Sequence, residues 1–328
     1  MMEESGCLAF SEALQELVDE QMPPSSSHLY SLSVPSLAEA QWFRRQWPTL
    51  PVERRRKILA LLVESAEANF ELDFNALFRV TMEDEDDQVR AASVEGLWED
   101  EDAALVAPLV SMLRHDAAMS VRAAAASALG RFVLLAELEE LAERHAQLIR
   151  GALLEATDNS EEHVEVRRRA VESIAYLEED CVPEIIAAAY QEPDEAMRIS
   201  AVFSMGRSAD AVWSSIVQDE LSNANPAMRY EAARACGELE VKEAALDLVR
   251  LIADPDREVQ FAAIAALGQI GGKRARQALE QCYRSEDEIR RLAAEDALAE
   301  LALGERPLNL LAFDLDLEAG AEEDEELR

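Results

Sequence analysis

The stretch VQFAAIAALG, Val259–Gly268, recurs along the chain with the same spacing of apolar and small residues. Close copies begin at Val121, Met197 and Met228, and looser copies begin at Val89, Val166 and Ile289. Successive copies start 32, 45, 31, 31, 31 and 30 residues apart. A repeat near this period predicts stacked supersecondary units rather than separate globular domains.

Each copy predicts an amphipathic helix with a small residue at the centre of its buried face. If the first apolar residue is position zero, position four is always small: Ser93, Ala125, Ala170, Ala201, Ala232, Ala263 and Ala293. Position four shares a helix face with positions zero and eight. Three residues before position zero stand the expected N-caps Asp86, Asp194, Asn225 and Asp256. At position nine stand Gly130, Gly206, Gly237 and Gly268, which we expect to end their helices in a left-handed conformation.

A second apolar run with helical spacing separates successive copies, at 105–113, 182–190, 212–221, 244–252 and 275–283. No copy shows strand alternation, so each unit is expected to be helix, turn, helix. The pattern D-x-x-V-R-x-x-A-A-x-A-L-G, over roughly residues 84–301, resembles HEAT repeats. The similarity is greatest to the short bacterial version named after phycobilisome lyases. The resemblance implies an all-α, right-handed α–α superhelix, a HEAT/armadillo-like solenoid of about seven to nine helical hairpins.

The chain on either side of the repeats differs in composition from them. Residues 1–35 predict an N-terminal helix and a loop rich in Pro and Ser, and 36–82 predict N-terminal capping helical pairs. The repeats fill 83–303, and 304–328 form an acidic tail that is expected to be partly disordered. The 45-residue step places an insertion near 131–157, which predicts either one long second helix or an extra pair of helical turns.

The charge of the chain is strongly negative, at −36 from 31 basic and 67 acidic residues. Such a charge favours a soluble protein that repels nucleic acid and anionic membrane surfaces. The apolar stretches are too short to span a bilayer, and the N-terminus carries acids where a secretory signal would carry bases. Four scattered cysteines, Cys7, Cys181, Cys236 and Cys282, are expected to be small core residues in a reducing compartment. We therefore expect a cytoplasmic protein without membrane insertion.

No motif predicts catalysis. Deoxyhypusine hydroxylase-like HEAT proteins carry paired His-Glu dipeptides, but here no histidine (His28, His115, His145 and His163) is followed by Glu. No E-x-x-H or H-E-x-x-H spacing is present, and 268–273 lacks the spacing and the Ser or Thr of a phosphate loop. HEAT-like DNA glycosylases use a basic surface, whereas residues 83–301 carry 22 bases and 46 acids. We expect no enzyme activity, catalytic residue, metal, cofactor or nucleic-acid partner.

Three features are candidates for binding another protein. Position two is apolar in consecutive units, and these residues form either an exposed stripe or packed seams between repeats: Ile199, Tyr230 and Phe261. Trp213 begins a second helix and is expected to project into a concave groove. A basic segment contains Arg44, Arg45, Arg54, Arg55, Arg56 and Lys57. The arginines that follow position zero are expected instead to pair with acids of an adjacent repeat.

The interpretation is a non-enzymatic scaffold or adaptor that binds another protein through solenoid surfaces. Two alternatives stay open: an accessory chromophore lyase or carrier, resembling phycobilin lyases, and an assembly factor or chaperone for an enzyme complex. The acidic tail is also expected to be able to dock on Arg44–Lys57 within the same chain.

Overall fold

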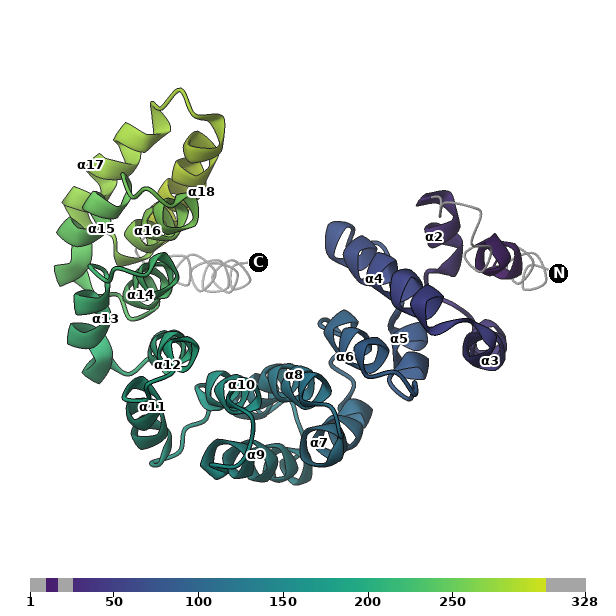
Figure 1. The fold of residues 1–328 in the computed structure, drawn as a ribbon. Coiled ribbons are helices and arrows are strands. Elements are labelled where there is room, and N and C mark those ends of the chain that lie inside the picture. Colours follow the sequence, from purple (N-terminus) through teal and green to yellow (C-terminus); the bar gives the residue numbers. More distant parts are fainter. Residues whose placement is uncertain (1–9, 17–25, 305–328) are drawn as a thin grey trace, which may run out of the picture. The chain divides into compact units, whose positions relative to one another are not determined.

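The computed structural model describes residues 10–16 and 26–304, shown as the coloured ribbon of Figure 1. Within these residues every regular element is a helix, and no strand occurs. The chain divides between Ser204 and Met205 into two compact units. The all-helical repeat architecture expected from the sequence is therefore confirmed.

The first unit begins with a short helix at 10–16. It continues with α2 (Ser26–Leu32), α3 (Leu37–Gln46), α4 (Val52–Ala68), α5 (Asn75–Thr81), α6 (Asp87–Gly96), α7 (Val106–His115), α8 (Met119–Glu137), α9 (Glu143–Asp158), α10 (Val164–Ile174) and α11 (Val182–Tyr190). Helix α12 (Glu195–Arg207) crosses the division. The second unit has α13 (Ser214–Glu220), α14 (Pro226–Glu238), α15 (Ala245–Leu251), α16 (Arg257–Ile270), α17 (Gly272–Tyr283) and α18 (Glu288–Gly304).

Each unit is built of two layers of helices. The helices that carry the repeated motif pack side by side, α6, α8 and α10 in the first unit and α14, α16 and α18 in the second. The intervening helices form the other layer, as α7 packs on α8, α9 on α10, α15 on α16 and α17 on α18. We call the even-numbered layer the motif helices.

The motif helices have the expected buried face and the expected caps. In α8, positions zero, four and eight are Val121, Ala125 and Leu129, and none of them is exposed. The cap residue Asp86 accepts a hydrogen bond from the backbone of Val89, and Asp194 accepts one from Met197. Small residues at position four allow adjacent motif helices to pack closely.

The position-nine glycines lie inside their helices, so the prediction that they end them was wrong. A Cβ atom on Gly206 would lie 2.8 Å from the Cα of Ala235, and one on Gly268 would lie 2.8 Å from the carbonyl oxygen of Ala297. Glycine therefore permits the close approach of the next motif helix. In the second unit the left-handed residues come three positions later, at Ala209, Glu240 and Gly271.

The last copy of the motif begins one residue later than the sequence suggested. Ile289 is 55% exposed, whereas Ala294 is fully buried and takes the place expected for Ala293. Asp287 accepts a hydrogen bond from the backbone of Arg290, as a cap three residues before position zero should. Position zero is therefore Arg290, and the spacing of 31 residues continues to the end of the repeats.

Two segments, the insertion near 131–157 and the expected Pro/Ser-rich loop, differ in structure from the prediction. The insertion lengthens both helices of its unit, α8 to 19 residues and α9 to 16, with a turn at 138–142. It is neither one long second helix nor an extra pair of turns. Within the expected Pro/Ser-rich loop, α2 forms because Leu29 and Leu32, three residues apart, are both buried. The tail at 305–328 and the start of the chain lie outside the described residues.

Candidate protein-binding groove

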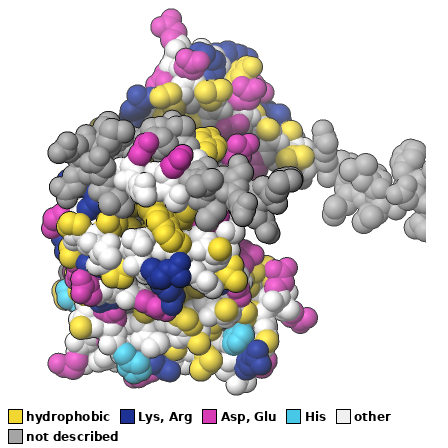
Figure 2. Space-filling view, turned by 90° about the vertical axis from the view of Figure 1, so that its right-hand side faces the viewer, with side chains coloured by type: hydrophobic (Ala, Val, Ile, Leu, Met, Phe, Trp, Pro, Cys, Tyr) yellow, Lys and Arg dark blue, Asp and Glu magenta, His cyan; other side chains and the backbone are white. Residues whose placement is uncertain are grey.

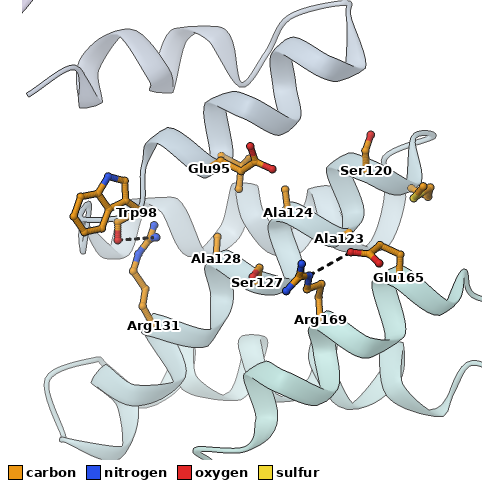
Figure 3. A pocket seen from close by; sticks show the side chains of 12 residues that line it. Glu95, Trp98, Ser120, Ala123, Ala124, Ser127, Ala128, Arg131, Glu165 and Arg169 are labelled. Carbon is orange, nitrogen blue, oxygen red and sulfur yellow. Dashed lines mark hydrogen bonds and ion pairs between the residues drawn. The ribbon is translucent and has the colours of Figure 1, made fainter. Parts of the chain in front are cut away.

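The motif helices of the first unit enclose a hollow of about 670 Å³ between α6, α8 and α10. Figure 3 shows its floor, made by Ala124, Ser127 and Ala128 of α8. Glu95 stands on one side of this floor and Arg169 on the other. We call this hollow and its lining the α8 groove.

The α8 groove exists because the positions of α8 that line it carry small side chains. Positions two, three, six and seven of this copy are Ala123, Ala124, Ser127 and Ala128. The same positions on α10 include Arg168, Arg169 and Glu172, whose long side chains rise above the helix. A row of short side chains between longer ones leaves a trough.

Trp98 and Met119 give the α8 groove exposed apolar surface. Each residue is 41% exposed, and Trp98 lies just beyond Leu97, the C-cap of α6. The indole ring makes an edge contact with Phe70, with ring centroids 6.2 Å apart. This contact holds the ring at the edge of the hollow, where a partner's apolar side chain can cover it.

Arg131 is the one groove cation with an unsatisfied buried nitrogen. It donates hydrogen bonds from Nε to the carbonyl oxygen of Asp100 and from Nη1 to that of Trp98, at 3.1 and 3.3 Å. Its Nη2 is buried without a hydrogen-bond partner. Burial lowers the pKa of the Arg131 guanidinium to about 10. A guanidinium in this state favours a ligand that offers a hydrogen-bond acceptor.

The other charges of the α8 groove differ in how far they are neutralised. Arg169 donates to Glu172 at 2.8 Å and to Glu165 at 3.3 Å, so its charge is balanced within α10. Burial by the surrounding protein raises the pKa of Glu95, and repulsion by Glu67 raises it further. The hollow thus contains one acidic group, Glu95, and one basic group, Arg131, that are not paired with each other.

A second, smaller hollow adjoins the first and shares Ser127 and Arg131 with it. It has a volume of about 250 Å³, and its other walls include Tyr176 and Phe203, both half-buried. The exposed face of the first unit therefore continues from Trp98 past Arg131 to two further aromatic side chains. A trough of this kind fits an extended or helical segment better than a small molecule.

The apolar residues singled out from the sequence lie elsewhere. Ile199 is half-buried on α12 in the region of the division between the units. Tyr230 and Phe261 are half-buried in the second unit, each with an arginine over its ring, Arg234 at 5.7 Å and Arg257 at 5.6 Å. Both rings are thus partly covered by side chains of their own helices.

Trp213 does not project into a groove. It is only 6% exposed and lies in the short 3-10 turn Ala211–Trp213 that precedes α13. Its indole nitrogen is buried without a hydrogen-bond partner. The hollows of the first unit are lined by motif helices, so the expectation that second helices supply the groove was wrong for this residue.

Three of the six basic residues of the segment are engaged with the acidic turn at 83–86. Arg55 is buried and donates to both carboxylate oxygens of Asp84 at 2.7 Å. Arg56 donates to both oxygens of Asp86, and Arg44 lies 3.4 Å from Glu83. Within this turn, Asp84 is only 7% exposed. Arg54 is half-buried and also has a partner, whereas Arg45 and Lys57 are exposed.

Most of the arginines after position zero form the expected ladder between adjacent units of the repeat. Four of the six pair with an acid in the loop before the next motif helix: Arg90 with Asp116, Arg122 with Glu162, Arg167 with Glu192 and Arg229 with Asp254. The other two differ from the prediction, because Arg198 donates to the backbone of Glu192 and Pro193, and Arg290 donates to the side chain of Gln260. These arginines are structural and do not form a binding row.

Figure 2 shows acidic and basic side chains interspersed on the visible face, without a broad basic patch among the coloured atoms. No group of three or more His, Cys, Asp or Glu in the described part of the chain is arranged to hold a metal ion. Burial raises the pKa of the Cys236 thiol to about 12, which suppresses its nucleophilic form at neutral pH. Of the described helices, α8 alone is long and apolar enough to cross a membrane, but it packs between α6, α7 and α10.

Sequence reasoning did not identify Trp98 or Arg131. A signal was present, because Trp98 occupies position nine, where four other copies have glycine. The run of small residues from Ala123 to Ala128 was a second signal. Together they indicate a helix whose exposed face is open rather than filled.

The family described as HEAT repeats matches residues 74–158 and 214–299, just over half of the chain. No curated protein matches it. Among solved structures, YibA of Escherichia coli is 18% identical, with a TM-score of 0.43, and the match covers 74% of this chain and 95% of that one. Human deoxyhypusine hydroxylase is 16% identical, with a TM-score of 0.35, and the match covers 91% and 98%. A designed armadillo repeat protein is 19% identical, with a TM-score of 0.38, and covers 60% and 99%.

Proposed function

Because the chain belongs to the HEAT-repeat family, we propose that it is a non-enzymatic scaffold that binds another protein through the α8 groove. Repeat solenoids of this kind are suited to binding extended segments along a continuous face. The observation that carries the proposal is the buried, unpaired Nη2 of Arg131 beside the exposed ring of Trp98.

The lining of the groove defines the kind of partner that fits it. An apolar side chain of the partner covers Trp98 and Met119, which are each 41% exposed. A carbonyl or carboxylate oxygen of the partner accepts a hydrogen bond from Arg131. The small side chains of α8 let the partner's backbone approach closely. The site is therefore best matched by a short amphipathic segment of a protein.

The proposal is tested by filling the groove. Ser127 is exposed on its floor, so Ser127→Trp blocks the hollow without disturbing the core. Ser215→Trp, at an exposed position of α13 outside the groove, is the matched control. Proteins are captured from native lysate on each variant, identified by mass spectrometry and then rebound as purified proteins.

A direct partner should lose at least ~10-fold in affinity with Ser127→Trp and with Trp98→Ser, and should bind the Ser215→Trp control normally. A partner that binds all three alike would show that the α8 groove is not the site. The triple change of Ile199, Tyr230 and Phe261 to Ser tests, in the same assay, the apolar residues that the sequence suggested for binding. An absorption scan of the captured material separates a scaffold from a chromophore carrier, because only a carrier brings down pigment.

A further inference from the structure

Helix α18 is apolar on two opposite sides. One side packs on α16 and α17 and is buried, through Ala294, Ala297 and Leu301. The other side is exposed, and its large apolar residues are Ile289, Leu292 and Leu303, at 55, 54 and 65%. Positions 289, 292, 296, 299 and 303 fall within one narrow stripe of a helix. A helix that faced only solvent on this side would carry polar residues there.

The exposed side of α18 is the side on which a further repeat would stack. In α16, the corresponding side is covered by α18, and position nine is Gly268 because the neighbouring helix lies so close. Position nine of α18 is Ala299, which is exposed. A methyl group at this place is compatible with a looser cover, but not with another motif helix at the same distance.

The chain that follows α18 has the composition to provide such a cover. The stretch LNLLAFDLDL at 308–317 is rich in large apolar residues, and the last residues after it are mainly acidic. The apolar stretch begins four residues after α18 ends, so its local concentration at this helix is high.

We propose that residues 308–317 dock on the exposed stripe of α18. The contact is apolar in character, because Asp296 lies within the stripe and repels the acids of the tail. A stable dimer buries roughly 800 Å² on each partner. The stripe offers only three large apolar side chains, which is too little apolar surface for an interface of that size. A segment of the same chain is therefore a better occupant than a second copy. The basic segment at 44–57 is a poorer docking site for the tail than α18, since Arg44, Arg55 and Arg56 already pair with acids.

Amide hydrogen exchange of the full chain tests this contact. The tail variant is Leu310→Ser with Phe313→Ser, and the reciprocal variant is Leu292→Ser with Leu303→Ser. Leu327→Ser, in the acidic end of the chain, is the matched control. Exchange is measured at two protein concentrations, with the molecular mass followed by light scattering.

The tail variant should speed exchange across 288–303 by at least ~10-fold and leave α14 and α15 unchanged. The reciprocal variant should speed exchange across 308–317, and the control should match the native chain. Equal exchange of 288–303 in the native chain and the tail variant would overturn the proposal. Protection that grows with concentration, together with a doubled mass, would overturn it too, because a second copy would then be the occupant.

Discussion

The motif helices of the two units present different faces, although the same repeat builds both. In the second unit, position two is Tyr230 on α14 and Phe261 on α16, and an arginine covers each ring. In the first unit, position two of α8 is Ala123, and the α8 groove opens above it. The repeat fixes how the helices stack, and the side chains outside the buried positions decide whether the face is filled or open.

The units also differ in how their seams are held. The first unit has a buried ion pair, Arg55 with Asp84, whose side chains are 3% and 0% exposed. In the second unit, α16 and α18 meet through a close contact at Gly268, in addition to ladder pairs such as Arg229 with Asp254. If this contrast is right, damage to the ion pair should affect the first unit alone, and damage to the glycine contact should affect the second alone.

The largest effect is expected from Arg55→Leu. This change leaves the Asp84 carboxylate buried, with only the indole Nε1 of Trp47 and the backbone of Asp86 as donors. Removing one partner of a buried pair costs about 3–5 kcal/mol. Chemical denaturation measures the loss, and hydrogen exchange should place it in the first unit.

The control for Arg55→Leu is Arg250→Leu, because Arg250 is 78% exposed and pairs only within its own helix with Asp247. We expect this change to cost less than about 0.5 kcal/mol. Similar losses from both variants would show that the Arg55 pair contributes no more than a surface ion pair.

Gly268→Ala should give the next largest effect. The added methyl group would lie 2.8 to 3.0 Å from the backbone of Ala297, so α16 and α18 must separate. Overpacking of this kind costs about 1–3 kcal/mol. Gly151→Ala is the opposite case, since the nearest atom, on the flexible side chain of Arg114, would be 3.8 Å away.

Gly151→Ala should stabilise α9 by up to about 1 kcal/mol, because alanine is the better helix former. The two substitutions are chemically identical and differ only in what the methyl group meets. Denaturation midpoints of both variants check the difference. A stabilising effect at both sites would show that Gly268 is not needed for close packing of α16 and α18.

The sequence predicted the repeat, several helix caps and four of the six pairs of the arginine ladder, because these follow from spacing and residue type. It did not predict the role of Gly268, since a glycine at a helix end and one at a helix crossing look alike without the neighbour in view. Arg55 and Arg56 were assigned to a binding patch for a similar reason, as their acidic partners lie about 30 residues away. The α8 groove needed the structure, because a hollow depends on the side chains of three helices together.

The contribution of the arginine ladder to the pH dependence of stability should be a smaller effect. The hydrogen bonds from Arg229 lower the pKa of Asp254 in the folded chain. Its contribution to stability is therefore present above the unfolded pKa of about 3.9, and is lost as the pH falls through the folded value. Asp254→Asn should reduce the fall in stability between pH 5 and pH 3 by about 1 kcal/mol or less.

Asp116→Asn tests the equivalent rung in the first unit. Burial raises the pKa of Asp116, but the hydrogen bonds from Arg90 and the Ala118 backbone, together with the charges of Arg90 and Arg122, lower it overall. Urea midpoints at the two pH values check both variants, with Asp247→Asn as the control outside the ladder. If Asp254→Asn and Asp116→Asn leave the pH dependence unchanged, the ladder does not differ energetically from surface pairs in either unit.

The smallest effect concerns the turn after α14, where Glu240 has a φ of 49°. A residue with a Cβ is disfavoured in this left-handed region, whereas glycine is not. Glu240→Gly should therefore raise stability by about 0.5–1 kcal/mol, even though glycine also increases the entropy of the unfolded chain. Glu243→Gly, in the helical turn Lys242–Ala244, should lower stability by a similar amount. Opposite changes in stability from the same substitution at Glu240 and Glu243 would show that the repeat ends its helices through the left-handed residue at position twelve. Of the left-handed position-twelve residues in the second unit, Ala209, Glu240 and Gly271, only Gly271 is a glycine.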